Sequence, residues 1–204
     1  MEDNYLTITS PVETIYKIKS SKFLTYAYPV EREEEIAPLL EVLKKQHYDA
    51  THHCYAWRLG AKGEHFRAND DGEPSSTAGK PILGQMVSRG VTNCFIVVVR
   101  YFGGTKLGVS GLIEAYRDSA AEALDAAEIV ERTVDVRLRV EFSYISMNGV
   151  MKVVKELQPK IESQEFDNLC VMILSIRKSQ SAALIGRLEK CDGTTFEVIE
   201  PAEE

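Results

Sequence analysis

The first stretch of sequence that could do chemistry is His52-His53-Cys54, the only histidine cluster in the chain. Alternate side chains of a strand face opposite sides, so His52 and Cys54 share one face and His53 lies on the other. A His-x-Cys pair could supply two zinc ligands, but a catalytic zinc takes three protein ligands and a structural zinc takes four. We therefore expect no metal and no cofactor here. We also expect Cys54 to be a buried thiol, because adjacent strand residues do not easily form the thiol–imidazole pair of a cysteine nucleophile.

The second stretch is a loop that carries three carboxylates, Asp70, Asp71 and Glu73, ahead of Thr77 and Lys80. The hydroxyls at 75–77 are candidates to cap a helix over about 78–88. Hydroxyls, a glycine and a lysine at a helix N-terminus also favour an anion site. Two interpretations stay open, a ligand-binding site and a solvated turn that leads into a capped helix.

The third stretch, RYFGGTKLG at 100–108, joins a strand to a helix. Free amides at a helix start attract phosphate, and glycines let a backbone approach closely. The stretch is not a P-loop, because Val109-Ser110 follows where Lys-Ser/Thr is required. The segment 108–111 resembles the GxxG of KH domains but lacks basic middle residues. Alternatively, the glycines serve packing alone.

In a nucleic-acid interface, Arg100 and Lys106 would contact the backbone, and Tyr101 or Phe102 would stack on a base. The three stretches together define one set of candidate binding residues. These are His52, His53, Asp70, Asp71, Glu73, Thr77, Lys80, Arg100, Tyr101, Gly103, Gly104 and Lys106.

Periodicity predicts the elements that must position these side chains. Strands are expected at 14–19, 23–30, 51–59, 64–68 and 93–100, the last dense in β-branched residues and buried on both faces. Helices are expected over 31–47, 78–88 and 109–128, with Pro38 making the first turns of the first helix irregular. Because the three stretches fall at strand ends and helix starts, we expect them to meet at one edge of a sheet.

The pattern changes near residue 131, which predicts a second domain. We expect a half-buried strand at 134–142, a hairpin formed by 160–167 and 169–177, and a last strand at 195–199. Helices are expected over 145–157 and 179–190. This βαββαβ order is the ferredoxin-like plan. We therefore predict an α+β protein with domains at 1–131 and 132–204.

Charge and composition bound the function. The formal net charge is −7, divided as −5 over residues 1–131 and −2 over 132–204, so any polyanion contact must come from a few placed side chains. No apolar run approaches the ~20 residues that span a bilayer, which argues against a membrane protein, and we expect no membrane partner. The N-terminus lacks the basic and apolar regions of a secretion signal, and the four cysteines form no CxxC pair. We expect a cytoplasmic protein with reduced thiols.

Three motifs together resemble the IMPACT family in its bacterial, YigZ-like branch. They are HHCYAW at 52–57, NDDGEPSSTAGKPIL at 69–83 and VVVRYFGGTKLGVSGLIEAY at 97–116. The resemblance implies an N-terminal α/β sandwich like domain 2 of ribosomal protein S5. It also implies a ferredoxin-like C-terminal domain similar to the last domain of the translocating elongation factor (elongation factor G domain V). Eukaryotic members regulate translation.

The resemblance and the loop at 100–108 favour a non-enzymatic, translation-associated regulatory protein. It would bind RNA, the ribosome or a translation factor through the N-terminal motif face, and no feature indicates DNA specificity. A protein-interaction module that needs no basic patch is a variant of this hypothesis. The alternative is a small-ligand or phosphate-binding enzyme that uses the cluster of His52, Asp70 and Lys80.

Overall fold

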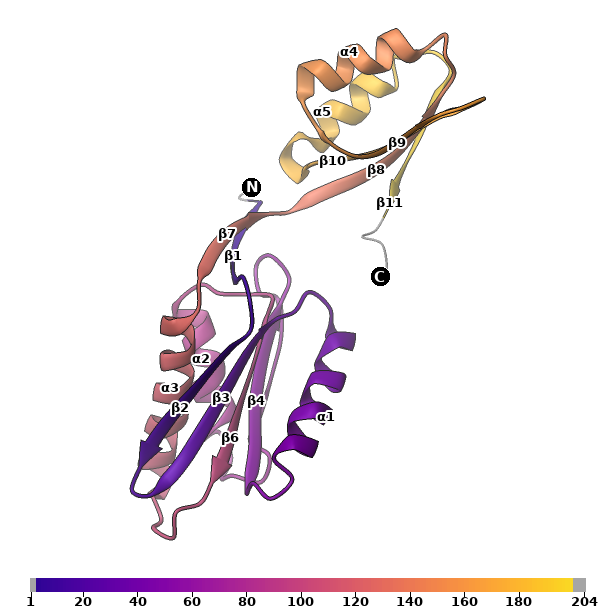
Figure 1. The fold of residues 1–204 in the computed structure, drawn as a ribbon. Coiled ribbons are helices and arrows are strands. Elements are labelled where there is room, and N and C mark those ends of the chain that lie inside the picture. The colour runs from indigo at the N-terminus through magenta and orange to yellow at the C-terminus, as the bar shows by residue number, and fades with distance from the viewer. Residues whose placement is uncertain (1–2, 200–204) are drawn as a thin grey trace. The chain divides into compact units, whose positions relative to one another are not determined.

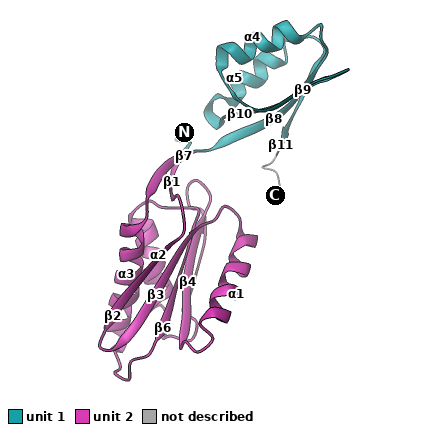
Figure 2. Cartoon of the chain, viewed as in Figure 1, with its two compact units in different colours: residues 1–3, 133–204 teal, residues 4–132 magenta. Residues whose placement is uncertain are grey.

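The computed structural model describes residues 3–199, which divide into two compact units (Figure 2). The N-terminal unit is Asn4–Arg132, and the C-terminal unit joins Asp3 to the residues from Thr133 onward. Residues 1–2 and 200–204 of the two predicted domains lie outside the described residues. Within residues 3–199, no helix has the length and apolar character needed to cross a membrane.

A five-stranded antiparallel sheet with the order β2-β3-β6-β4-β5 organises the N-terminal unit (Figure 1). Its strands are β2 (Val12–Ile18), β3 (Ser21–Pro29), β4 (His52–Leu59), β5 (His65–Asn69) and β6 (Cys94–Tyr101). Helices α2 (Gly79–Ser88) and α3 (Gly108–Ala126) pack on one face of this sheet. Helix α1 (Ile36–Gln46), which follows the 3-10 turn η1 (Glu33–Glu35), packs on the other face (Figure 1).

Strand β6 lies at the centre of this sheet and is buried on both faces, as its β-branched sequence predicts. Its even-numbered residues from Cys94 to Val98 join the core under α2 and α3. Its odd-numbered residues from Phe95 to Val99 join the core under α1. Two separate apolar layers therefore fix the strand, so each side chain at its end has a defined face.

The C-terminal unit has the observed order β8-α4-β9-β10-α5-β11, which matches the predicted βαββαβ order. Its elements are β8 (Asp135–Phe142), α4 (Met147–Leu157), β9 (Lys160–Phe166), β10 (Cys170–Arg177), α5 (Lys178–Leu188) and β11 (Thr194–Ile199). The strands form an antiparallel sheet with the order β11-β8-β10-β9. Both helices pack on one face of this sheet through Leu138, Val150 and Leu184.

The predicted strands and helices are present, with ends that differ by a few residues. Pro38 lies in the first turn of α1, where a missing N–H leaves no helical bond unmade. Two strands were missed, β1 (Asn4–Ile8) and β7 (Ile129–Thr133), which pair with each other in a separate two-stranded sheet. Each strand has five residues, and its partner lies more than a hundred residues away in the sequence.

Candidate functional site

A buried ion pair lies where β6 ends beneath the α3 face of the sheet. Arg100 Nη1 is 2.5 Å from Glu73 Oε1, and the two side chains are 7 % and 3 % exposed. Tyr116 of α3 donates its hydroxyl to the same Glu73 oxygen at 2.8 Å. The Arg100 guanidinium also lies 5.6 Å from the ring centroids of both Phe23 and Phe102. Arg100 is thus held by one carboxylate and two aromatic rings.

Arg100, which the sequence predicts as a contact to a nucleic-acid backbone, is a buried residue. Arg100 is 6 % exposed, because its strand position turns it toward the α3 core rather than toward solvent. Its charge is matched by Glu73. The arginine therefore ties the end of β6 to the loop that carries Glu73.

His52 lies directly opposite Arg100 in the β4–β6 register and shares its face of the sheet. Its Nδ1 is 2.7 Å from the Asp71 carbonyl oxygen. A carbonyl can only accept, so Nδ1 carries a proton and a neutral His52 ring presents an unprotonated Nε2. That Nε2 lies 3.8 Å from Glu73 Oε2, which is too long for a hydrogen bond.

A cavity of about 370 Å³ lies at the end of the sheet, beside His52, Glu73 and Arg100. Its wall is formed by Thr51, His52, Glu73, Pro74, Arg100, Phe102, Lys106, Leu107, Gly108, Val109 and Leu112. The cavity thus joins parts of all three sequence stretches with the start of α3. The expectation that the stretches meet at one edge of the sheet is confirmed for His52, Glu73, Arg100 and Lys106.

The carboxylate of Asp70 holds the start of α2. Its Oδ1 accepts from the amides of Ala78 and Gly79 at 3.0 and 2.8 Å, and its Oδ2 accepts from the amide of Ser76 at 2.8 Å. The prediction that a hydroxyl at 75–77 caps this helix is therefore wrong. The hydroxyl of Thr77 instead donates to the Pro74 carbonyl at 2.7 Å. A carboxylate eight residues upstream supplies the cap, because the loop folds back on itself.

The other residues of this loop have separate roles. Asp71, at φ +40°, accepts from the His53 amide at 2.6 Å through its carboxylate. Lys80 is exposed and does not line the cavity. The proposed enzymatic cluster of His52, Asp70 and Lys80 is thus not assembled as one site. Within residues 3–199, no three His, Cys, Asp or Glu side chains group as metal ligands.

The opposite face of the sheet receives Tyr101 and His53, because neighbouring strand residues alternate. Tyr101 donates its hydroxyl to Asp49 at 3.1 Å and lies 2.9 Å from His47 Nδ1. His47 Nε2 is 2.7 Å from the hydroxyl of Tyr26, whose pKa burial raises to about 12. The prediction that Tyr101 stacks on a base therefore conflicts with its hydroxyl network beside α1.

Two expectations for β4 are confirmed: Cys54 is a buried thiol, and His53 lies on the face opposite His52. Cys54 is fully buried, and its thiol lies 3.0 Å from the Asp70 carbonyl and 3.3 Å from the Tyr116 hydroxyl. Burial raises the thiol pKa, which keeps the group protonated and inert. His53 is buried on the α1 face, and burial lowers its pKa.

The glycine turn after β6 owes its composition to close packing at one position. A Cβ on Gly103 would lie 2.1 Å from the backbone of Ser20, in the turn between β2 and β3. The Gly103 amide donates to Ser21 Oγ at 3.1 Å, so it is not a free anion ligand. Gly104 has φ +86° and faces open space, so it serves the turn conformation.

Exposed lysines gather on the α1 face at the same end of the sheet, a feature that sequence reasoning missed. Lys17 of β2 lies directly opposite Lys22 of β3, and both line a second hollow of about 460 Å³. Neither lysine forms an ion pair within residues 3–199. Phe102, 48 % exposed, lines both this hollow and the first cavity. Predicting the lysine pair would have required the register of β2 against β3.

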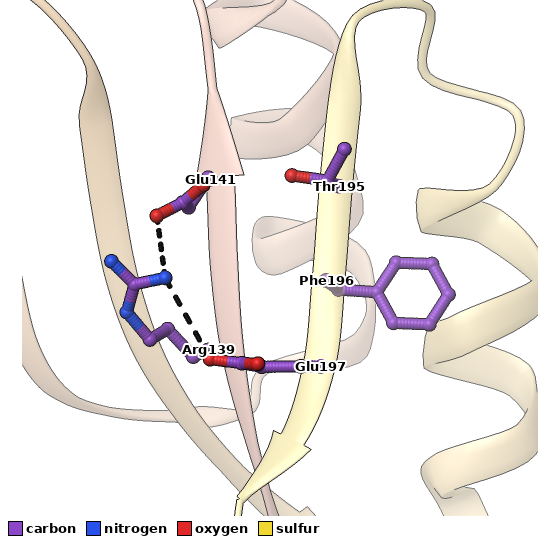
Figure 3. Close-up of a pocket in the computed structure, with 5 residues that line it drawn as sticks. All are labelled: Arg139, Glu141, Thr195, Phe196 and Glu197. Atoms are coloured by element: carbon purple, nitrogen blue, oxygen red, sulfur yellow. Dashed lines mark ion pairs between the residues drawn. The ribbon is translucent and has the colours of Figure 1, made fainter.

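A smaller hollow of about 160 Å³ lies on the open face of the C-terminal sheet (Figure 3). Arg139 stands between Glu141 and Glu197 and pairs with both. Phe196 points away from these charges and packs under the helices. Because two carboxylates offset the single guanidinium, this face does not favour an anionic ligand.

Residues 19–124 match the model of the Impact N-terminal domain family. The chain is 37 % identical to the IMPACT family member YvyE of Bacillus subtilis over 78 % of this chain and 73 % of that protein. It is 30 % identical to the IMPACT family member YigZ of Escherichia coli over 91 % and 92 %.

One solved structure covers the whole length of both chains, with a TM-score of 0.71 and 28 % identity; it is described as a hypothetical protein. The family match spans the three motif stretches and the cavity that they line. The chain therefore belongs to the IMPACT family.

Proposed function

We propose that this protein is a non-enzymatic, translation-associated regulator that binds single-stranded RNA, free or within a ribosome or translation-factor complex. The contact surface is the lysine end, defined as Lys17, Lys22, Lys106 and Phe102 at the end of the N-terminal sheet. The observation that carries the proposal is the pair of lysines facing each other across β2 and β3.

Like charges directly opposite on neighbouring strands repel and destabilise the pair. In a chain of net charge −7, Lys17 and Lys22 place two exposed cations side by side, and neither forms an ion pair within residues 3–199. A phosphate bridging Lys17 and Lys22 would turn this repulsion into attraction. Release of counterions from the RNA would add a favourable, salt-dependent contribution to binding.

Phe102 supplies the sequence-tolerant part of the interface. Aromatic rings beside a basic groove stack on bases without reading their identity. Phe102 lines both hollows, and the guanidinium of Arg100 lies 5.6 Å from the centroid of its ring. Its amide donates to Thr51 Oγ1 at 3.3 Å, which anchors the backbone that carries the ring.

Fold and family give associational support. We assign the N-terminal unit to the ribosomal protein S5 domain 2-like sandwiches and the C-terminal unit to the ferredoxin-like folds of the elongation factor G domain V type. The relatives in Saccharomyces cerevisiae and Dictyostelium discoideum are named IMPACT homologues. A translation role for this chain extends that likeness.

Fluorescence anisotropy with a labelled single-stranded RNA, titrated at several salt concentrations, tests the lysines. Lys17→Gln with Lys22→Gln should weaken binding and reduce the slope of log K against log salt by about 0.7, the contribution of the one phosphate that both lysines contact. The matched control is Lys152→Gln with Lys155→Gln, two exposed lysines of α4 in the C-terminal unit. Equal slopes for both double variants would refute the lysine contact.

Phe102→Ala tests the stacking contact. Loss of one stacked base costs about 1–3 kcal/mol, or roughly 5- to 150-fold in affinity. Phe66→Ala is the control, because Phe66 of β5 is 61 % exposed and lines neither hollow. Absence of RNA binding by the unmodified protein at low salt would refute the function as a whole.

A further inference from the structure

The two oxygens of the Glu73 carboxylate have different surroundings. Oε1 accepts from Arg100 Nη1 and from the Tyr116 hydroxyl. Oε2 has no hydrogen-bond donor within residues 3–199, and His52 Nε2 lies 3.8 Å from it. The side chain is 3 % exposed and lines the cavity, so this oxygen is an acceptor reached through the cavity. An acceptor in that position binds any donor that enters the cavity.

His52 supplies a second acceptor beside the first. Its Nδ1 proton is committed to the Asp71 carbonyl, so the neutral ring offers a lone pair at Nε2. His52 and Glu73 both line the 370 Å³ cavity. Two acceptors 3.8 Å apart therefore lie in the wall of one cavity, with no donor between them.

A single hydroxyl satisfies only one of the two acceptors, whereas a vicinal diol brings two donors side by side. We propose that this cavity binds the ribose 2′,3′-diol of the 3′-terminal nucleotide of an RNA, with one hydroxyl donating to Glu73 Oε2 and the other to His52 Nε2. This inference rests on the proposed function and deepens it, because the ribose hydroxyls distinguish RNA from DNA.

The rest of the cavity fits the same nucleotide. Its volume lies within the range of small-molecule sites, roughly 300–1,000 Å³. Phe102 offers a ring on the wall for the terminal base, and Lys106 is exposed at the same cavity. Lys106 and the first amides of α3 would meet the phosphate that joins this nucleotide to the strand. A 3′-phosphate, in contrast, would place negative charge against Glu73.

The test modifies the RNA and leaves the protein intact. Anisotropy at pH 8, where an ordinary imidazole is neutral, compares an RNA ending in a 2′,3′-diol with three relatives. A 3′-terminal 2′-deoxynucleotide and a 3′-terminal phosphate should each weaken binding by about fivefold or more. An internal 2′-deoxynucleotide should have no effect. Equal affinity for all four, or a loss confined to the internal substitution, would overturn the proposal.

A protein variant assigns the effect to the cavity. His52→Gln should abolish the preference for the diol while it leaves the salt dependence unchanged, and His65→Gln, at an exposed position of β5, should change neither. Retained diol preference in a folded His52→Gln protein would overturn the assignment. Adenosine monophosphate that displaces the RNA at equal concentration would assign the diol site to a free nucleotide instead. RNA binding without diol preference would leave the lysine end standing.

Discussion

The buried pair of Arg100 and Glu73 makes one strong prediction about stability. Glu73→Gln keeps the shape of the side chain and an amide oxygen for the Tyr116 hydroxyl, but it removes the charge that matches Arg100. The guanidinium would remain buried without a counter-charge. Breaking a buried pair in this way costs about 3–5 kcal/mol. Tyr116→Phe removes the hydrogen bond to the carboxylate and the hydroxyl that accepts from the Cys54 thiol, but no charge, and should cost about 1.5–3 kcal/mol.

Removing both charges together should cost less than removing one. Replacing a buried pair by apolar side chains is often neutral, so Glu73→Leu with Arg100→Met leaves mainly the unpaired Tyr116 hydroxyl, at about 1–3 kcal/mol. The double variant should therefore be more stable than Glu73→Gln alone. This ordering separates an electrostatic pair from two independent packing contacts.

Urea unfolding followed by tryptophan fluorescence measures these differences. Trp57 is the only tryptophan of the chain and is 6 % exposed within the N-terminal unit, so its emission reports that unit alone. Glu41→Gln is the control, because the Glu41–Lys45 pair is exposed on both sides and should leave the midpoint unchanged. A loss below about 1 kcal/mol for Glu73→Gln would refute the reasoning, and so would a double variant whose loss is the sum of the losses of Glu73→Leu and Arg100→Met made singly.

Three further predictions concern the elements around the cavity. Gly103→Ala should destabilise the protein by about 1–3 kcal/mol because its Cβ meets backbone at 2.1 Å, whereas Gly84→Ala in α2, with open space at its Cβ, should stabilise it by up to about 1 kcal/mol; thermal melts compare the two. Asp70→Ala should destabilise the protein by about 1–2 kcal/mol through loss of the α2 cap, whereas Glu34→Ala, at an exposed position, should leave its stability unchanged. Hydrogen exchange at the first turn of α2 would check this. Burial lowers the pKa of His53, so stability should be full above the ordinary histidine pKa of about 6.5 and fall as the pH drops below it; a urea midpoint for His53→Gln that falls as steeply as the unmodified protein's would contradict this.

Much of the fold could be predicted from the sequence, because local patterns report local structure. The β-branched run at 93–100 becomes a strand buried on both faces, and the apolar stripe after Gly108 becomes α3. The alternation of 134–142 becomes β8. Strands β1 and β7 escaped detection, because a five-residue strand whose partner is distant in the chain leaves no periodic signal.

For the site, strand alternation alone correctly separated His52 from His53. The meeting of the three motif stretches also followed from their places at strand ends and helix starts. Which partner each side chain takes did not follow. Asp70 became a helix cap, and Arg100 became a buried partner of Glu73. Both outcomes depend on how the loop over 70–78 folds back onto the sheet.

The sequence by itself determined most of the elements, the family and the set of motifs, because periodicity, composition and spacing are properties of the chain alone. Only the tertiary structure decided which charges are buried and which are free. Strand register places Lys17 opposite Lys22, and packing against α3 buries the ion pair of Arg100 and Glu73. Burial and pairing are properties of contacts between distant segments, and the electrostatics of a site follows those contacts.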